Sequence, residues 1–179
     1  MHADNWANKA KQEGYRTRAV YKLEEILQKT KSLKRSQNVL DLGSAPGGWA
    51  HYIKKKSPNS VVYAIDILDM EAVDGVYFFQ NSIEEIDNID SISSKMGSFG
   101  LVISDIAPNI TGINAIDTEN IYELNLLTLD TATKYLNKSH GSFIMKTFQN
   151  SMLKNLRKKM ELSFKIVQTF KPAASKKQS

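Results

Sequence analysis

The stretch that decides the fold is Val39-Leu40-Asp41-Leu42-Gly43-Ser44-Ala45-Pro46-Gly47-Gly48-Trp49. An apolar run ends in a Gly/Pro-rich turn, and a segment typical of a helix follows the turn. In α/β proteins such a junction lies outside the carboxyl end of a strand, where nucleotide-like ligands bind. Glycines let the backbone approach a ligand closely, and the N-terminus of a helix offers N–H groups that have no intrahelical partner.

The acid in this stretch, Asp41, narrows the class of ligand. A carboxylate suits a ligand with positive charge or donor hydroxyls better than it suits a pyrophosphate. S-adenosyl-L-methionine, with its sulfonium, amino group and ribose, is such a ligand, and we expect it as the cofactor.

Length and composition favour one domain over residues 1–179, with 41% hydrophobic residues to build a core. The sequence has no apolar run of the ~20 residues that a membrane span needs, and residues 1–6 resemble no signal segment. We therefore expect a cytoplasmic protein without membrane contact. Cysteine is absent and the three histidines are widely spaced, so we expect no metal site.

The formal net charge is +5, and the basic residues gather over 9–22, 154–159 and 171–177. Clusters of this kind suit a polyanion such as RNA. Solvated helix faces are the alternative, and we favour that alternative for residues 154–159.

Apolar runs alternate with amphipathic segments along the whole chain. We expect strands over 39–42, 61–66, 76–80, 101–105, 142–146 and 164–169, and helices over 18–32, 49–56, 83–96, 118–137 and 151–162. This alternation predicts an α/β fold whose central, mostly parallel sheet carries helices on both faces.

Charged residues end four of the expected strands: Asp41, Asp66, Asp105 and Lys146. The carboxyl ends of parallel strands share one edge of a sheet, so these side chains should converge on one crevice. Each Asp could instead cap a helix or start a turn, but three acids and a lysine on one edge favour a ligand site.

Five segments together resemble the FtsJ/RrmJ-type ribose 2′-O-methyltransferases. They are Arg16-Thr17-Arg18-Ala19-Val20-Tyr21-Lys22-Leu23-Glu24-Glu25-Ile26, Asp41-Leu42-Gly43-Ser44-Ala45-Pro46-Gly47-Gly48-Trp49, Ser104-Asp105-Ile106-Ala107-Pro108-Asn109, Lys146-Thr147-Phe148-Gln149 and Lys171-Pro172-Ala173-Ala174-Ser175. The glycine-rich loop alone is weak evidence, because many methyltransferases share it, whereas five motifs in family order are specific. The resemblance implies a Rossmann-like class I methyltransferase fold and transfer of a methyl group from S-adenosyl-L-methionine to a ribose 2′-hydroxyl.

The branch that looks most similar is the bacterial enzyme acting on a uridine in the A-loop of large-subunit ribosomal RNA. The implied partner is ribosomal RNA or the large ribosomal subunit, and we expect a monomer. The family's catalytic set is Lys–Asp–Lys–Glu, which by motif places Lys22, Asp105 and Lys146 in the first three roles.

The resemblance also assigns donor and RNA contacts. Asp66 would bind the donor's ribose, and Gly47 and Trp49 its methionine end, beside Asp41, Gly43 and Asp105 in the same site. Ser82 stands where the family carries an Asp for the adenine, and a hydroxyl is a weaker partner than a carboxylate. The residues expected to contact RNA phosphates are Arg16, Arg18 and Lys22.

The sequence leaves the role of Lys146 open. A general base must be neutral, and burial near the cation Lys22 would favour the neutral form, whereas Asp105 would favour the charged form. Lys146 is therefore either the base that takes the proton of the 2′-hydroxyl or a charged donor that orients this hydroxyl.

One departure from the family concerns its fourth catalytic residue. The family's final strand and its Glu have no counterpart in the sequence, so we expect the last strand to be missing and the sequence to be an incomplete version of the natural protein.

Two other functions remain open. A nicotinamide-dependent oxidoreductase would need Gly-x-Gly-x-x-Gly after the first strand, and this loop lacks it. A methyltransferase-fold protein that binds RNA or assists ribosome assembly without activity is the stronger alternative.

Overall fold

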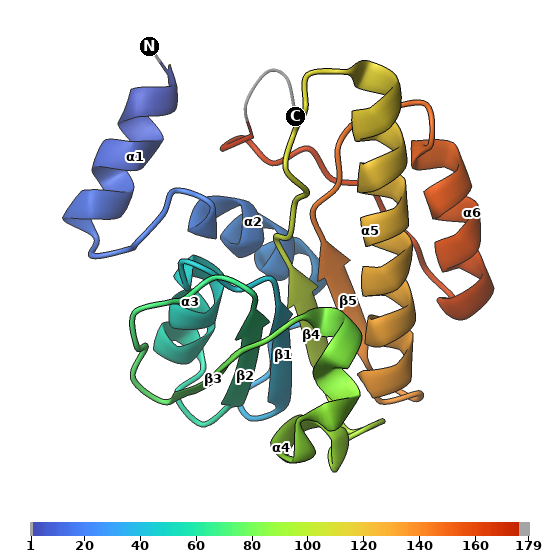
Figure 1. The fold of residues 1–179 in the computed structure, drawn as a ribbon. Coiled ribbons are helices and arrows are strands. Elements are labelled where there is room, and N and C mark those ends of the chain that lie inside the picture. The colour runs from blue at the N-terminus through green and yellow to red at the C-terminus, as the bar shows by residue number, and fades with distance from the viewer. Residues whose placement is uncertain (1, 176–179) are drawn as a thin grey trace.

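Five parallel strands form the centre of the molecule, which the computed structural model describes over residues 2–175. The strands lie in the order β3-β2-β1-β4-β5 (Figure 1), and all point their carboxyl ends to one edge. Their bounds are β1 Asn38–Leu42, β2 Val61–Asp66, β3 Val76–Gln80, β4 Leu101–Ser104 and β5 Ser142–Met145. The predicted fold class, a parallel sheet between helices, is therefore confirmed.

The register of the strands decides which residues meet at that edge. Leu42 of β1 pairs with Ser104 of β4, and Ser104 pairs in turn with Met145 of β5. Asp105 and Lys146 each follow directly after these paired residues. The sheet alone therefore brings them to neighbouring positions.

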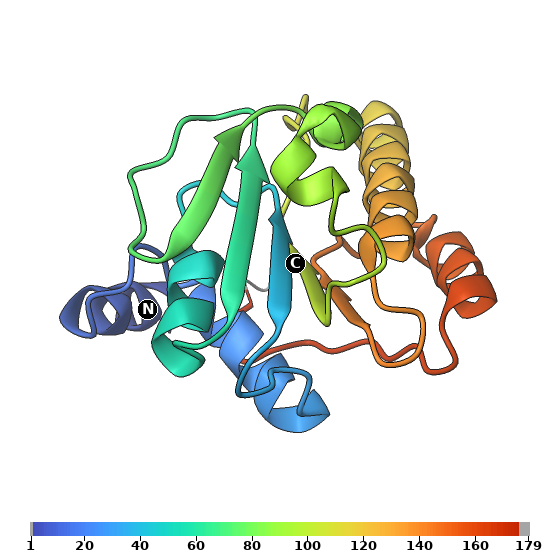
Figure 2. The same ribbon diagram turned by 90° about the horizontal axis from the view of Figure 1, so that it is seen from below.

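Two helices cover one face of the sheet: α2 (Val20–Thr30) and α3 (Gly48–Lys56). Leu23 of α2 and Ile53 of α3 are fully buried against Val39 and Ile103 of the sheet. Figure 2 shows these helices on one side of the strands and the later helices on the other.

The opposite face is covered by later segments: the 3-10 helix η1 (Ile83–Asn88), α4 (Asp90–Ser93) and α5 (Asn114–Tyr135). This face carries the strand residues that alternate with those facing α2 and α3: Leu40, Leu42 and Val102. They belong to the same buried cluster as Tyr135 of α5. The helix α6 (Leu153–Ser163) lies beside α5 and buries Leu156. None of the helices described over residues 2–175 combines the length and the apolar character that crossing a membrane requires.

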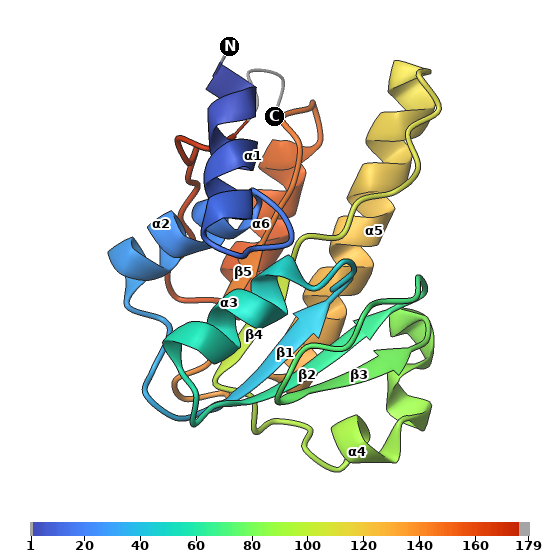
Figure 3. The same ribbon diagram turned by 90° about the vertical axis from the view of Figure 1, so that its left-hand side faces the viewer.

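The N-terminal helix α1 (His2–Gln12) is an element that the sequence analysis did not predict. Figure 3 shows it standing over α2 and α3. Trp6 of this helix packs against Tyr21 of α2, with 5.0 Å between their ring centroids. In the segment that follows the helix, the ring centroid of Tyr15 lies 6.0 Å from that of Tyr52 in α3.

Two predicted elements are wrong. Residues 164–169 form no strand, because they join no ladder of the described sheet: Phe164 stacks on Phe143, whereas the side chain of Ile166 is 78% exposed. Residues 83–96 form η1 and α4 rather than one helix, because Ile89 adopts an extended conformation (φ −95°, ψ 94°) between them.

Candidate active site

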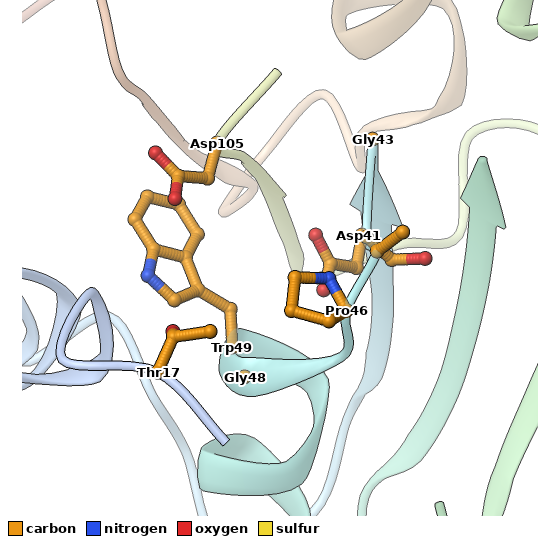
Figure 4. A pocket seen from close by; sticks show the side chains of 9 residues that line it. Thr17, Asp41, Gly43, Pro46, Gly48, Trp49 and Asp105 are labelled. Atoms are coloured by element: carbon orange, nitrogen blue, oxygen red, sulfur yellow. The ribbon is translucent and has the colours of Figure 1, made fainter. Parts of the chain in front are cut away.

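A pocket opens at the carboxyl edge of β1 and β4. Figure 4 shows Asp41 from β1, Trp49 from α3 and Asp105 from the segment after β4 around it. Its other lining residues come from the glycine-rich loop and from the segment before α2: Thr17, Gly43, Ser44, Ala45, Pro46 and Gly48. The pocket therefore lies at the predicted junction.

The glycine-rich loop is so closely packed that side chains would not fit in it. A Cβ on Gly43 would lie 2.7 Å from the Cβ of Ile106, and a Cβ on Gly48 would lie 2.6 Å from Oγ1 of Thr17. Gly47, which caps α3, has a φ of 90° that favours glycine. The glycines therefore let the loop pack closely against Ile106 and Thr17, whereas close approach of their backbone to a ligand stays a prediction.

Asp66 holds this loop through backbone N–H groups. Its Oδ2 accepts a hydrogen bond from the N–H of Ala45 at 2.8 Å, and its Oδ1 accepts one from Leu68 at 2.8 Å. The carboxylate thus ties the end of β2 to the pocket loop. Each oxygen has two acceptor sites, so contact with a ribose hydroxyl remains open to it.

Arg16 clamps the same loop from the other side. Its Nη1 donates to the carbonyl oxygens of Pro46 at 3.0 Å and Glu71 at 2.6 Å, and its Nη2 donates to that of Ala72 at 2.7 Å. A guanidinium suits this task because its donors are fixed in a planar fork. Its predicted contact with RNA phosphate stays a prediction, and the clamp is a role that the sequence analysis missed.

Asp41 is buried, with 1% of its surface exposed, and its two carboxyl oxygens find no hydrogen-bond partner among the described residues. Burial, and next the charges of Asp105 and Asp66, raise the pKa of the Asp41 carboxyl well above its usual range. The backbone N–H of Ala50 in the first turn of α3 opposes this rise in pKa without reaching hydrogen-bond geometry.

Asp105 and Lys146 meet at the mouth of the pocket. The Nζ of Lys146 lies 2.8 Å from Oδ1 of Asp105 and donates a hydrogen bond to the Asp105 carbonyl oxygen at 2.5 Å. Both side chains are about three-quarters buried, with 22% and 27% exposed. Their predicted meeting at one edge is thus observed, whereas their catalytic roles stay predictions.

Trp49 and Thr17 form the side wall of the pocket. The indole of Trp49 is 4% exposed, packs in the core under α2, and donates its Nε1–H to the Ala19 carbonyl at 2.9 Å. Thr17 was quoted as part of a motif but not predicted to line the site. The only sign of this role in the sequence is the position of Thr17 between two arginines of that motif.

The remaining predicted residues, Ser82, Lys22 and Arg18, do not line this pocket. Ser82 follows β3, and its Oγ accepts a hydrogen bond from the N–H of Glu84 at 3.2 Å, which caps η1. Lys22 lies in the first turn of α2 and Arg18 just before that helix, and both side chains are half-buried. Their predicted contacts with adenine and RNA are not part of the described structure.

These features together fit a cationic donor of the S-adenosylmethionine type. Such a ligand needs close backbone approach, carboxylates for its positive groups and acceptors for its hydroxyls. The lining supplies glycines, the unpartnered oxygens of Asp41 and the carboxylate of Asp105. Asp66 does not line the pocket, but it is hydrogen-bonded to Ala45 of the lining.

Comparison with known proteins identifies relatives of the whole chain. Residues 15–179 match the family model described as "FtsJ-like methyltransferase". The chain is 37% identical over 179 residues to "Ribosomal RNA large subunit methyltransferase E" of Dechloromonas aromatica, covering 98% of this chain and 87% of that protein. A relative with the same name from Borrelia garinii is 40% identical over 178 residues, covering 98% and 91%.

The fold has a solved relative as well. A structure from Plasmodium falciparum, titled as a ribosomal RNA methyltransferase, is 29% identical and superimposes with a TM-score of 0.81 over 89% of this chain and 93% of that chain. With a family model matched over residues 15–179 and relatives at 37% and 40% identity, the chain belongs to the FtsJ-like methyltransferase family.

Proposed function

We propose that this methyltransferase transfers the methyl group of S-adenosyl-L-methionine to a ribose 2′-hydroxyl of large-subunit ribosomal RNA, with a uridine of the A-loop as its target. The observation that carries the proposal is the Lys146–Asp105 pair, with 2.8 Å between Nζ and Oδ1, at the mouth of the glycine-lined pocket. The printed names of the relatives support ribosomal RNA as the substrate class.

The donor supplies an electrophilic methyl group on a positively charged sulfur, and the protein supplies alignment and electrostatics. The loop of Gly43 and Gly48 would bind the donor, with Asp66 at its ribose. Trp49 and Thr17 would close one side of the pocket against solvent.

For Lys146 we favour the role of a charged donor that orients the ribose hydroxyl. Its ammonium has three hydrogens, of which one is donated to the carbonyl oxygen of Asp105; Oδ1 of Asp105 lies 2.8 Å away as an ion-pair partner without hydrogen-bond geometry. A remaining hydrogen can hold the hydroxyl so that a lone pair faces the methyl group.

Contact with RNA would come from the segment that carries Arg18 and Lys22. This segment begins next to Thr17 in the pocket wall and continues into α2. Cations there would hold the phosphates on either side of the target ribose. We propose Lys22 as the member of the catalytic set that comes from this segment.

The test is transfer of labelled methyl groups from S-adenosyl-L-methionine to ribosomal particles and to free ribosomal RNA. We expect incorporation at a ribose, and a loss of roughly 10²–10³-fold for Lys146→Ala, which removes a positioned hydrogen-bond donor at the reacting hydroxyl. Donor binding should persist in Lys146→Ala, because Lys146 does not line the donor pocket. Lys158→Ala, on the exposed side of α6, serves as the matched control.

Equal incorporation by Lys146→Ala and by the unchanged protein would contradict this mechanism. Binding of donor and RNA with no incorporation on any ribosomal substrate would favour the alternative function, an RNA-binding or assembly protein without activity. The Lys146–Asp105 pair weighs against that alternative, since RNA binding alone does not need a lysine held by a carboxylate beside a donor pocket.

A further inference from the structure

One carboxyl group in the pocket, that of Asp41, has no hydrogen-bond partner in the described part of the chain. Asp41 is 1% exposed, yet it lines the pocket. A buried charge without partners is costly, and in practice such a group becomes neutral. A buried acid that faces a ligand pocket can regain its charge when a cation arrives there.

The groups around Asp41 favour this behaviour. Asp105, beyond β4, and Asp66, at the end of β2, are both acids, so they add repulsion to the cost of burial. From α3, the N–H of Ala50 faces the carboxyl group but does not reach hydrogen-bond geometry. The cation beyond β5, Lys146, is engaged by Asp105. No cation of residues 2–175 is therefore recorded as a partner for a carboxylate at Asp41.

We propose that Asp41 carries a proton before the methyl donor binds and releases it to solvent when the cationic donor enters the pocket. Donor binding would then be coupled to the loss of up to one proton. The inference rests on the proposed donor, S-adenosyl-L-methionine, whose sulfonium and ammonium groups supply the positive charge.

The coupling has a definite sign. Burial and the neighbouring acids raise the pKa of Asp41 in the protein without donor, and a bound cation lowers it again. At a pH between these two pKa values, Asp41 is protonated in the free protein and must lose its proton when the donor binds. The affinity for the donor therefore rises with pH in that range, by at most about tenfold per pH unit, and is constant above it.

Titration calorimetry of the full chain with S-adenosyl-L-methionine measures the proton directly. The titration is run at about pH 6, where the amino group of the donor stays fully protonated and adds no proton exchange of its own. Two buffers with different heats of ionisation are compared. The difference between the observed heats gives the number of protons released per donor bound.

The decisive variant is Asp41→Asn, which keeps the shape of the side chain and cannot ionise. We expect this variant to bind the donor more weakly, with no proton release and no dependence of affinity on pH over the same range. Asp130→Asn, on the exposed surface of α5, is the matched control and should release as many protons as the unchanged protein.

The outcomes are separable. Donor binding without net proton exchange would overturn the inference and leave the proposed function standing. Equal proton release by Asp41→Asn and the unchanged protein would also overturn it, because another group would then be the source. Absence of donor binding by the unchanged protein would remove both the inference and the proposed function.

A second measurement on the unchanged protein does not depend on the folding of the variant. The infrared difference spectrum should lose a protonated-carboxyl C=O band when the donor binds. Persistence of that band, or its absence before binding, would contradict the inference.

Discussion

At the scale of single residues, Asp41 places a cost on the folded protein that the unfolded chain does not bear. Its carboxyl group is solvated in the unfolded chain and buried without partners in the folded one. The Asp41 carboxyl group therefore binds its proton more tightly in the folded state, because burial and two nearby acids raise the pKa of this group there. Stability linked to Asp41 is fully present at acidic pH and is lost as pH rises from the ordinary Asp value towards the raised one.

We predict that Asp41→Asn stabilises the protein without donor at neutral pH. Asn retains the cost of an unsatisfied polar group but not the cost of ionisation, which amounts to about 1.4 kcal/mol for each unit of pKa shift. Urea unfolding at a series of pH values measures the free energy of unfolding of both proteins. The two values should become similar towards about pH 4, near the ordinary Asp pKa, and the variant should be the more stable protein at higher pH. A gap that does not change with pH would contradict this account.

Single residues also mark what could be predicted from sequence. The meeting of Asp105 and Lys146 followed from two strand ends in one parallel sheet, which needs only the pattern of apolar runs. The clamp by Arg16 could not be predicted, because its partners are three backbone carbonyls, two of them in the loop after β2. Every residue type offers such a carbonyl, so the sequence carries no sign of it.

At the scale of elements, the same clamp joins three parts of the chain: the segment before α2, the pocket loop and the loop after β2. We predict that Arg16→Lys weakens donor binding by on the order of 10-fold, because a lysine lacks the fork that spans three carbonyls. Binding of RNA should change little, since the positive charge is kept.

Calorimetry with the donor and filter binding with a ribosomal RNA fragment separate the two effects of Arg16→Lys. Arg35→Lys, an exposed arginine before β1, is the control and should change neither. If Arg16→Lys lowered RNA affinity alone, Arg16 would act as a phosphate contact rather than as a clamp.

The contact between α3 and the segment before α2 permits a sharper prediction. A Cβ at Gly48 would meet Oγ1 of Thr17 at 2.6 Å but its Cβ only at 3.6 Å. Gly48→Ala should therefore destabilise the protein by about 1–3 kcal/mol, and Thr17→Ala should relieve that clash in the double variant. A thermal-unfolding double-mutant cycle measures the coupling, and additive effects would show that the two segments do not touch as described.

Elements were predictable where burial sets their pattern. The expected strands over 39–42, 61–66, 76–80, 101–105 and 142–146 agree with the structure within a residue at each end. Residues 164–169 have a composition similar to that of these strands, but they pair with no strand of the described sheet. The composition of a segment does not indicate whether a neighbouring strand is there to pair with it. The helix α1 was missed because its contacts are long-range aromatic ones, of which Trp6 with Tyr21 is an example.

At the scale of the whole molecule, the sheet separates two cores and leaves its carboxyl edge for chemistry. One core lies under α2 and α3, and the other lies under η1, α4 and α5. The pocket is built from segments after β1 and β4, together with the segment before α2. Because that last segment carries Arg18 and leads into Lys22, donor site and proposed RNA contact share one edge of the protein.

That arrangement predicts which of the basic clusters contacts RNA. The logarithm of the RNA affinity should fall linearly with the logarithm of salt concentration, and each lost phosphate contact should reduce the slope by about 0.7–0.9. We expect this reduction for Arg18→Ala and for Lys22→Ala, with a ribosomal RNA fragment as the probe.

Lys158→Ala should leave the slope unchanged, because we assign the cluster over 154–159 to a solvated face of α6. Urea unfolding of each variant checks that the fold is retained, and an equal reduction for Lys158→Ala would place RNA on α6 as well and end this assignment.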